Sequence, residues 1–185
     1  MINYLSLTAF IILIALAVGR GFMLRRRGSN AFVLGVTNKS DLLLIPIVLL
    51  FFYALLSTAL GFPFPKVLIK PFFTNNVAGW MGIIICYVSI VWFAMTLRSF
   101  GKSFRIGIDE RSPDKLITSG MFALSRNPIF TAFIAFVVGI FLIHPNITAS
   151  AAIVFFVTVI HRQILREEKF LCGHYGKEYE DYCCG

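Results

Sequence analysis

The stretch of sequence that decides the fold covers residues 121–165 and reads MFALSRNPIFTAFIAFVVGIFLIHPNITASAAIVFFVTVIHRQIL. It holds two apolar windows, 121–143 and 146–165, and each is long enough for a helix to cross a hydrocarbon layer of about 30 Å. The windows meet at His144-Pro145-Asn146, a break that is too short for a loop leaving the membrane. The sequence therefore predicts a tight antiparallel hairpin of two membrane-spanning helices.

Three further apolar windows precede this hairpin, at residues 2–22, 42–61 and 79–97. The composition agrees, because 58% of the 185 residues are hydrophobic and only 14% are charged. Roughly a quarter of a soluble domain is charged, so the composition excludes a water-soluble globule, a disordered chain and a nucleic-acid-binding module. We therefore expect an all-α, multi-pass transmembrane helical bundle of about five spans, formed as a single integral-membrane domain over residues 1–185.

The cysteines argue against a protein held together by metal ions or disulfides, and the first apolar run argues against a cleaved signal peptide. The four cysteines show no metal-ligand spacing such as CxxC, so we expect neither a metal site nor a disulfide framework. A basic cluster within residues 20–27 follows the first apolar run, whereas a cleaved signal peptide carries its positive charge before such a run. The run is therefore predicted to remain as the first span.

The positions of the basic residues predict the orientation of the spans. With the N-terminus outside, fifteen of the 17 Lys and Arg fall on one side of the membrane, and only Lys66 and Lys70 fall on the other. Cytosolic loops of membrane proteins are enriched in Lys and Arg. We therefore expect the N-terminus outside, and the C-terminus in the cytosol together with the long connection between the third and fourth spans.

Polar residues gather in two of these predicted cytosolic segments, the connection 98–126 and the tail from residue 161 onward. Eight of the nine acidic residues lie in them: Asp109, Glu110, Asp114, Glu167, Glu168, Glu178, Glu180 and Asp181. Any chemistry should occur where the two segments meet, although solvated membrane flanks have the same composition. Composition alone leaves both interpretations open.

Two motifs in these segments resemble a known family of membrane enzymes. Residues 115–130, KLITSGMFALSRNPIF, are similar to the LVTSGxYxxxRHPxY signature of the isoprenylcysteine carboxyl methyltransferase and phospholipid methyltransferase family. Residues 166–182, REEKFLCGHYGKEYEDY, resemble the EExxLxxxFGxxYxxY motif of the same family. The motifs stand in the family's order on either side of the predicted hairpin, so the resemblance covers roughly residues 115–182.

The resemblance implies a methyltransferase that uses S-adenosyl-L-methionine as cofactor, with three membrane spans in residues 1–97 and a catalytic region in residues 98–185. Carried over to matching positions, it implies these cofactor-binding residues: Lys115, Leu116, Ile117, Phe122, Arg126, Asn127, Pro128, Phe130, Glu167 and Glu168. The methyl donor carries an α-amino group and a sulfonium. A carboxylate such as Glu167 can pair with the amino group, and the aromatic faces of Phe122 and Phe130 can accept the sulfonium.

Each of these residues also has a purely structural interpretation. Asn127 followed by Pro128 favours a helix start, in which the Asn side chain caps free amides. The two phenylalanines can serve packing alone, and the two glutamates can belong to an interfacial charge cluster. We expect the tyrosines of the second motif to be interfacial belt residues rather than ligands; these are Tyr175, Tyr179 and Tyr182.

Two positions depart from the family pattern. Asn127 replaces the His of the RHP motif, and because an amide does not titrate near neutrality, we exclude a general base there. Gln163 stands four residues before Glu167, where the isoprenylcysteine enzymes carry an Arg that holds the substrate carboxylate. Arg162 and Arg166 could substitute, but they lie on other faces of the helix. These two arginines and Gln163 are therefore the candidate catalytic residues.

Three classes of function remain open. The leading one is a methyltransferase with a lipophilic acceptor, most like a protein-S-isoprenylcysteine O-methyltransferase, with phospholipid (ethanolamine) N-methyltransferase as its alternative. The second is a membrane NADPH-dependent reductase of the sterol or steroid type, and the third is a non-catalytic membrane module. As partners we expect a lipophilic small molecule or lipidated substrate and membrane lipid, no nucleic acid, and no second copy of the chain.

Overall fold

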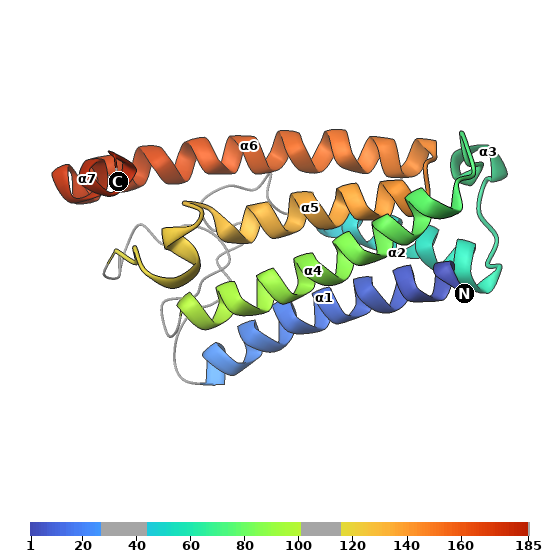
Figure 1. Ribbon diagram of the computed structural model, residues 1–185, viewed down its shortest axis with the longest axis horizontal. Coiled ribbons are helices and arrows are strands. Elements are labelled where there is room, and N and C mark those ends of the chain that lie inside the picture. The colour runs from blue at the N-terminus through green and yellow to red at the C-terminus, as the bar shows by residue number, and fades with distance from the viewer. Residues whose placement is uncertain (27–43, 101–115, 185) are drawn as a thin grey trace.

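The structure, a computed structural model, describes residues 1–26, 44–100 and 116–184, and these form helices and connecting turns. The elements follow one another as α1 (Ile2–Arg26), α2 (Leu44–Leu60), α3 (Lys66–Ile69), α4 (Asn76–Phe100), η2 (Gly120–Ala123), α5 (Pro128–Ile143), α6 (Ile147–Tyr175) and α7 (Lys177–Cys184). Figure 1 shows α1, α4, α5 and α6 side by side along the long axis of the molecule, with α7 at one end. The prediction of an all-α bundle is confirmed.

Among the described residues, three helices are long and apolar enough to cross a membrane, namely α1 over Ile2–Met23, α4 over Asn76–Ser99 and α6 over Ile147–Tyr175. Two shorter apolar helices accompany them, Ile45–Leu60 in α2 and Pro128–Ile143 in α5. With 16 residues, α5 measures about 24 Å, whereas the 29 residues of α6 measure about 43 Å. Because a hydrocarbon layer is about 30 Å thick, α6 has length to spare beyond it.

The start of α5 corrects the predicted window 121–143. Residues Gly120–Ala123 form a short 3-10 helix, and α5 begins only at Pro128. Proline fixes its own φ and has no amide hydrogen, which suits the first position of a helix and prevents the preceding turn from continuing into it. The side chain of Asn127 makes no capping hydrogen bond, so the predicted Asn cap is wrong while the predicted proline start is right.

The predicted hairpin of α5 and α6 is confirmed, and internal hydrogen bonds close its turn. Asn146 is buried, and its side-chain oxygen caps α6 by accepting a hydrogen bond of 2.9 Å from the amide of Ala149. In the same turn, His144 Nε2 lies 2.9 Å from Ser6 Oγ of α1. We call this end of the bundle the hairpin end; it comprises residues 1–8, 57–78 and 143–150.

The core is most closely packed where α4 crosses α5. A Cβ atom added to Gly82 would lie 2.5 Å from the carbonyl oxygen of Gly139, and one added to Gly139 would lie 2.7 Å from the sulfur of Cys86. Both distances are shorter than van der Waals contact, so only glycine permits the two backbones to approach this closely. The same core contains Phe93 and Phe136, each 1% exposed.

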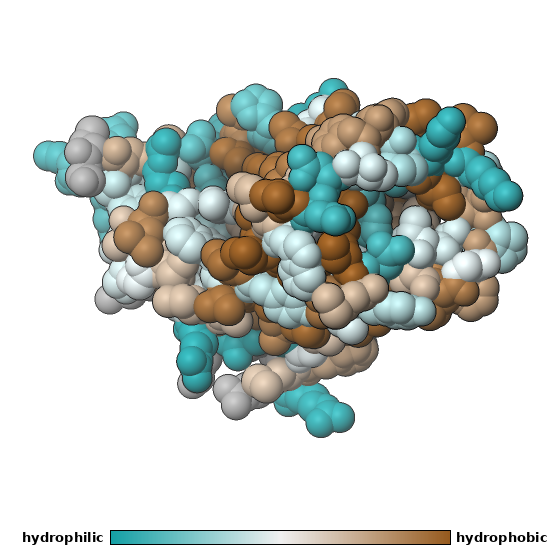
Figure 2. Space-filling view, turned by 45° about the vertical axis from the view of Figure 1, so that its right-hand side comes forward, coloured by the Kyte–Doolittle hydropathy of each residue, from teal (hydrophilic) through white to brown (hydrophobic). Residues whose placement is uncertain are grey.

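One face of α4 shows why the bundle needs lipid around it. Ile84, Val88, Val91 and Met95 recur at spacings of three and four residues, and each is at least 50% exposed. This spacing places them in a single stripe along the helix. Figure 2 shows many apolar side chains across the middle of one face of the molecule, with polar ones among them and at the edges. Such a surface is stable against acyl chains rather than water.

Candidate functional site

The candidate site lies at the opposite end of the bundle, where residues 116–127 lead into α5. Ser99, near the end of α4, accepts a hydrogen bond of 3.2 Å from the amide of Met121. Gly120 has a φ of +66°, and a Cβ added to it would lie 2.7 Å from Ser99 Oγ. The left-handed backbone and the lack of space both require glycine here. We call this end the tail end; it comprises residues 116–128 and 162–184.

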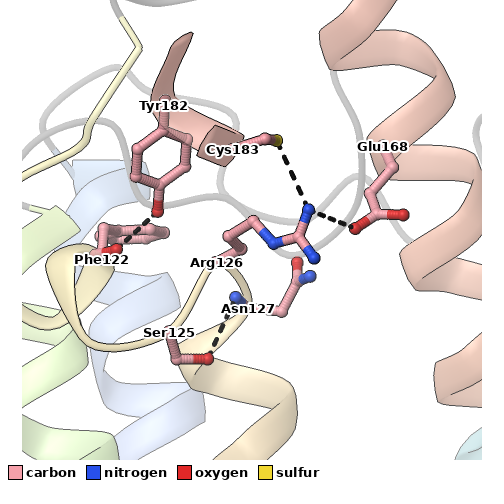
Figure 3. Close-up of polar contacts among 7 residues, drawn as sticks. All are labelled: Phe122, Ser125, Arg126, Asn127, Glu168, Tyr182 and Cys183. Carbon is pink, nitrogen blue, oxygen red and sulfur yellow. Dashed lines mark hydrogen bonds and ion pairs between the residues drawn. The ribbon is translucent and has the colours of Figure 1, made fainter. Parts of the chain in front are cut away.

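Arg126 connects residues 116–127 to both α6 and α7. Its Nη1 lies 3.6 Å from Oε1 of Glu168 on α6 and 3.4 Å from Sγ of Cys183 on α7. Figure 3 shows the guanidinium between these two partners. Because the Arg126 side chain is 52% exposed, the ion pair contributes little to stability and chiefly marks where the three segments meet. The two polar segments identified in the sequence thus contact each other.

The C-terminal helix α7 folds back onto the same segment. Gly176 separates α6 from α7 with a φ of +51°, a left-handed conformation that glycine adopts readily. On α7, Tyr179 is buried, and the Tyr182 hydroxyl donates to the carbonyl oxygen of Phe122, as Figure 3 shows. Burial raises the pKa of Tyr182, so its hydroxyl stays protonated and remains a hydrogen-bond donor. Sequence reasoning missed this contact, because the motif does not reveal which carbonyl the tyrosine reaches.

Glu167 and Gln163 occupy one face of α6, four residues apart. The side-chain nitrogen of Gln163 donates a hydrogen bond of 3.1 Å to Oε1 of Glu167, and both side chains are half-buried. A carboxylate offers about four lone-pair sites, so this bond leaves Glu167 with capacity for a cationic group. The hydrogen bond from Gln163 therefore orients the carboxylate of Glu167, which the sequence predicts to bind the cofactor.

The other loop residues predicted to bind the cofactor lie along residues 116–127. Leu116 and Ile117 are half-buried just before η2, and Phe122 is half-buried within it. Lys115 lies outside the described residues, so its role stays a prediction. The segment thus presents apolar side chains beside the polar contacts of Arg126.

The predicted residues on α5 and α6 differ in exposure. Pro128 is buried, and its carbonyl oxygen accepts a hydrogen bond of 3.0 Å from the indole of Trp92 on α4. Phe130 is half-buried two residues further along α5. On α6, Arg162 is exposed and Arg166 is half-buried. Arg162 thus lies at the solvent-accessible surface of the tail end, away from the half-buried face of α6.

The chain matches the phospholipid methyltransferase family over residues 74–178. This range is more than half of the 185 residues and contains α4, the hairpin and the Gln163–Glu167 pair. The chain belongs to the phospholipid methyltransferase family. Members of this family and of the related isoprenylcysteine methyltransferases use S-adenosylmethionine as methyl donor. The resemblance inferred from the two motifs is therefore confirmed.

Two curated plant proteins are similar to this member of the phospholipid methyltransferase family. They come from Oryza sativa subsp. indica and Oryza sativa subsp. japonica, and each is 30% identical to the chain over 107 residues. Each is named a probable protein-S-isoprenylcysteine O-methyltransferase. The match covers 56% of this chain and 56% of each relative, so the chain spans about half the length of the curated relatives it matches. No solved structure matches it significantly.

In this member of the phospholipid methyltransferase family, Asn127 contributes backbone contacts to the site. Its amide donates to Ser125 Oγ at 3.3 Å, and its carbonyl accepts from Thr131 Oγ1 at 3.1 Å. The amide side chain does not titrate near neutrality, so Asn127 cannot act as a general base. Within the described ranges, no group of three or more His, Cys, Asp or Glu side chains could hold a metal ion. The site therefore offers a carboxylate, a hydrogen-bonded loop and apolar side chains.

Proposed function

We propose that this chain is an S-adenosylmethionine-dependent methyltransferase with a lipophilic acceptor, most like a protein-S-isoprenylcysteine O-methyltransferase. The observation that carries the proposal is the half-buried carboxylate of Glu167, oriented by Gln163 on the helix that contacts Arg126 through Glu168. A methyl donor with an ammonium group needs such a carboxylate for a charge-assisted hydrogen bond. Family membership supplies the identity of the donor.

The residues of the site have separate roles in this proposal. Glu167 binds the ammonium group of S-adenosylmethionine, Phe122 and Phe130 accept the positive edge of its sulfonium, and Leu116 and Ile117 lie along it. The methyl donor supplies an electrophilic methyl group. The half-buried, apolar surroundings of these residues favour a reaction in which a positive and a negative charge disappear together. An anionic acceptor already has a free lone pair, which fits the absence of a base at position 127.

The acceptor is the least constrained part of the proposal. An arginine forms a bidentate, charge-assisted pair with a carboxylate. The amide of Gln163 cannot form this pair, so a carboxylate acceptor would bind less tightly by roughly 1.5–3 kcal/mol. Arg162 and Arg166 could replace it only if the acceptor bound in a shifted pose, because they project from other faces of α6. Gln163 therefore favours a second candidate acceptor, the amine of a phospholipid such as phosphatidylethanolamine, which reacts in its neutral form after its ammonium group has lost a proton to water.

The orientation in the membrane belongs to the same proposal. The predicted order of the spans puts fifteen of the 17 basic residues on one side of the membrane. We infer that this side is cytosolic and holds the tail end with its site, and that the N-terminus lies outside. A water-soluble methyl donor then arrives from the cytosol, and a lipophilic acceptor arrives from the bilayer. We assign residues 98–185 to the catalytic region of a single domain that works as a monomer.

Calorimetry on the detergent-solubilised protein tests the identity of the methyl donor. We expect S-adenosylhomocysteine to bind and NADPH not to bind, because the carboxylate of Glu167 attracts an ammonium group and repels phosphates. Binding of NADPH alone would support a membrane reductase instead. Binding of neither compound would support a non-catalytic membrane module.

Methylation assays test the acceptor. Farnesylcysteine analogues and phosphatidylethanolamine are each supplied in detergent micelles with labelled S-adenosylmethionine. We expect the farnesylcysteine analogues to react weakly, and Gln163→Arg to raise their kcat/KM by roughly tenfold to a hundredfold. Efficient methylation by the unaltered chain that is lost in Arg162→Ala or Arg166→Ala would show that a displaced arginine holds the carboxylate. Methylation of phosphatidylethanolamine alone would show that the acceptor is a phospholipid amine and not a prenylated cysteine.

A further inference from the structure

The 3-10 turn at residues 120–124 has few local hydrogen bonds to hold its conformation. The 3-10 helix η2 is four residues long, and its turn is closed by bonds to the Met121 carbonyl from the amides of Leu124 and Ser125, at 3.2 and 3.1 Å. A single turn of 3-10 helix is marginal by itself, because it orders several residues for few hydrogen bonds. The conformation of this segment therefore depends on contacts from other parts of the chain.

Two such contacts hold η2, one from α4, which precedes it in the chain, and one from α7, which follows it. Ser99 of α4 accepts a hydrogen bond from the amide of Met121 at 3.2 Å. Tyr182 of α7 donates its hydroxyl to the carbonyl oxygen of the next residue, Phe122, across a sequence separation of 60. One bond thus reaches the amide of Met121 from α4, and the other reaches the carbonyl of Phe122 from α7. Figure 3 shows the second bond.

The placement of Tyr182 depends on how α7 is anchored. Gly176 turns the chain at the end of α6, and Tyr179 is 2% exposed, so one face of α7 packs against the rest of the tail end. Tyr182 follows Tyr179 by nearly one helical turn and lies on the same face, with the two ring centroids 6.1 Å apart. Cys183, its neighbour, contacts Arg126 at the far end of the same segment. The last helix therefore contacts residues 120–127 at two points.

We propose that Tyr182 is a positioning residue for the methyl-donor site, and that its hydrogen bond to the Phe122 carbonyl holds η2 in the conformation that binds the donor. This inference rests on the proposed function. Tyr182 is the last residue of the second motif, which gives it no role, and it lies beyond the family match, which ends at residue 178. The role is therefore argued from the contact with Phe122. Tyr182 touches neither the methyl donor nor the acceptor in this role and acts through the backbone of Phe122.

Tyr182→Phe is the decisive variant, because it removes one hydroxyl and keeps the ring. Tyr53→Phe is the matched control, since the Tyr53 hydroxyl also donates to a backbone carbonyl, that of Pro63 at 2.7 Å, but at the hairpin end. One hydrogen bond corresponds to roughly a threefold to tenfold change in affinity. We expect Tyr182→Phe to raise both the Kd for S-adenosylhomocysteine and the KM for S-adenosylmethionine by about that factor, with kcat at saturating donor unchanged.

Hydrogen exchange provides a second measurement that needs no ligand. In the donor-free protein, amides of residues 120–125 should exchange faster in Tyr182→Phe than in Tyr53→Phe, while amides of α4 and α5 stay equally protected. Equal affinities and equal exchange in Tyr182→Phe and the unaltered chain would overturn the inference. Failure of the proposed function is distinguishable from this, because the unaltered chain itself would then not bind S-adenosylhomocysteine.

Discussion

The two ends of the bundle use polar side chains in opposite ways. At the hairpin end, Ser6 and Asn146 are 0% and 4% exposed, and both are hydrogen-bonded within the chain. At the tail end, Glu167 and Glu168 are half-buried, and Arg126 is exposed. Helices α5 and α6 contribute to both ends, and the ends differ in which polar groups remain accessible to molecules outside the chain.

This difference separates residues that stabilise the fold from residues that can bind a ligand. A buried polar group whose hydrogen bonds are satisfied within the chain would have to break them to bind anything else, at a cost of about 1–3 kcal/mol. A half-buried carboxylate with unused lone pairs does not have to break a bond first. Substitutions at the hairpin end should therefore change stability, and substitutions at the tail end should change binding.

The largest expected effect is that of Glu167→Gln at the tail end. Replacing the carboxylate removes a charge-assisted hydrogen bond to the ammonium group, so the affinity for S-adenosylhomocysteine should fall by about 1.5–3 kcal/mol, roughly tenfold to a hundredfold. Calorimetry measures the affinity, and a thermal melt should show no loss of stability. Unchanged affinity would remove Glu167 from the site.

Glu168→Gln is the matched control for that substitution. Glu168 follows Glu167 by one residue, about 100° around α6, and contacts Arg126 at 3.6 Å. We expect it to weaken binding of S-adenosylhomocysteine less than Glu167→Gln does. If the two effects were reversed in size, Glu168 would be the residue that holds the ammonium group.

Asn146→Ala at the hairpin end should lower the stability of the fold and leave ligand binding unchanged. The substitution removes the side-chain oxygen that caps α6 by accepting from the Ala149 amide. It also removes the hydrogen bond of 3.5 Å that the Asn146 side chain donates to the Ile69 carbonyl. We expect the free energy of unfolding in detergent to fall by about 1–2 kcal/mol, with the affinity for S-adenosylhomocysteine unchanged. A loss of affinity at constant stability would contradict the division between the two ends.

Acidification should weaken the hairpin end through His144, which lies in the turn between α5 and α6. Burial lowers the pKa of His144 to about 4, whereas an unfolded chain has a histidine pKa near 6.5. The unfolded state therefore binds a proton first as the pH falls through 6.5, and stability is lost between there and about pH 4. The free energy of unfolding, obtained from thermal melts, should be about 1 kcal/mol lower at pH 5.5 than at pH 7.5. In His144→Gln that difference should shrink; an undiminished pH dependence would exclude His144 as its source.

The smallest expected effect is that of Arg126→Gln on stability. This variant loses the ion pair with Glu168 and the contact with Cys183. Exposed ion pairs contribute at most about 1 kcal/mol, so the melting temperature should shift less than in Asn146→Ala. A larger shift than in Asn146→Ala would mean that the tail end is held as firmly as the hairpin end.

The sequence alone predicted the elements of this fold with few errors. Apolar windows and the break at residues 144–146 are local properties, because the length of an apolar run and a proline in a short turn constrain the backbone where they occur. The start of α5 was placed seven residues too early, at 121 instead of 128, because residues 121–124 are as apolar as the helix that follows. Hydropathy does not distinguish a 3-10 turn from a helix.

The motifs also named most residues of the candidate site before the fold was known. Residues 115–130 and 166–182 carry recognisable side chains at fixed spacings, and the structure brings Arg126 and Glu168 within 3.6 Å. The family match supports the assignment of the donor, but the role of each residue in binding it stays a prediction. The Asn127 cap was wrong because a favourable residue type does not ensure that its side chain turns toward the free amides.

The sequence by itself determined the five apolar helices, their order and the two polar segments, since each depends on neighbours along the chain. It did not predict α3, η2 or α7. The tertiary structure alone decided the approach of Gly82 to Gly139 and the contacts of Ser99 and Tyr182 with η2. These contacts join residues that are 22 to 60 positions apart, and their distances depend on how the helices pack. No local pattern encodes such a distance, because a hydrogen bond or a van der Waals contact is set to within a few tenths of an ångström by the packing of the whole bundle.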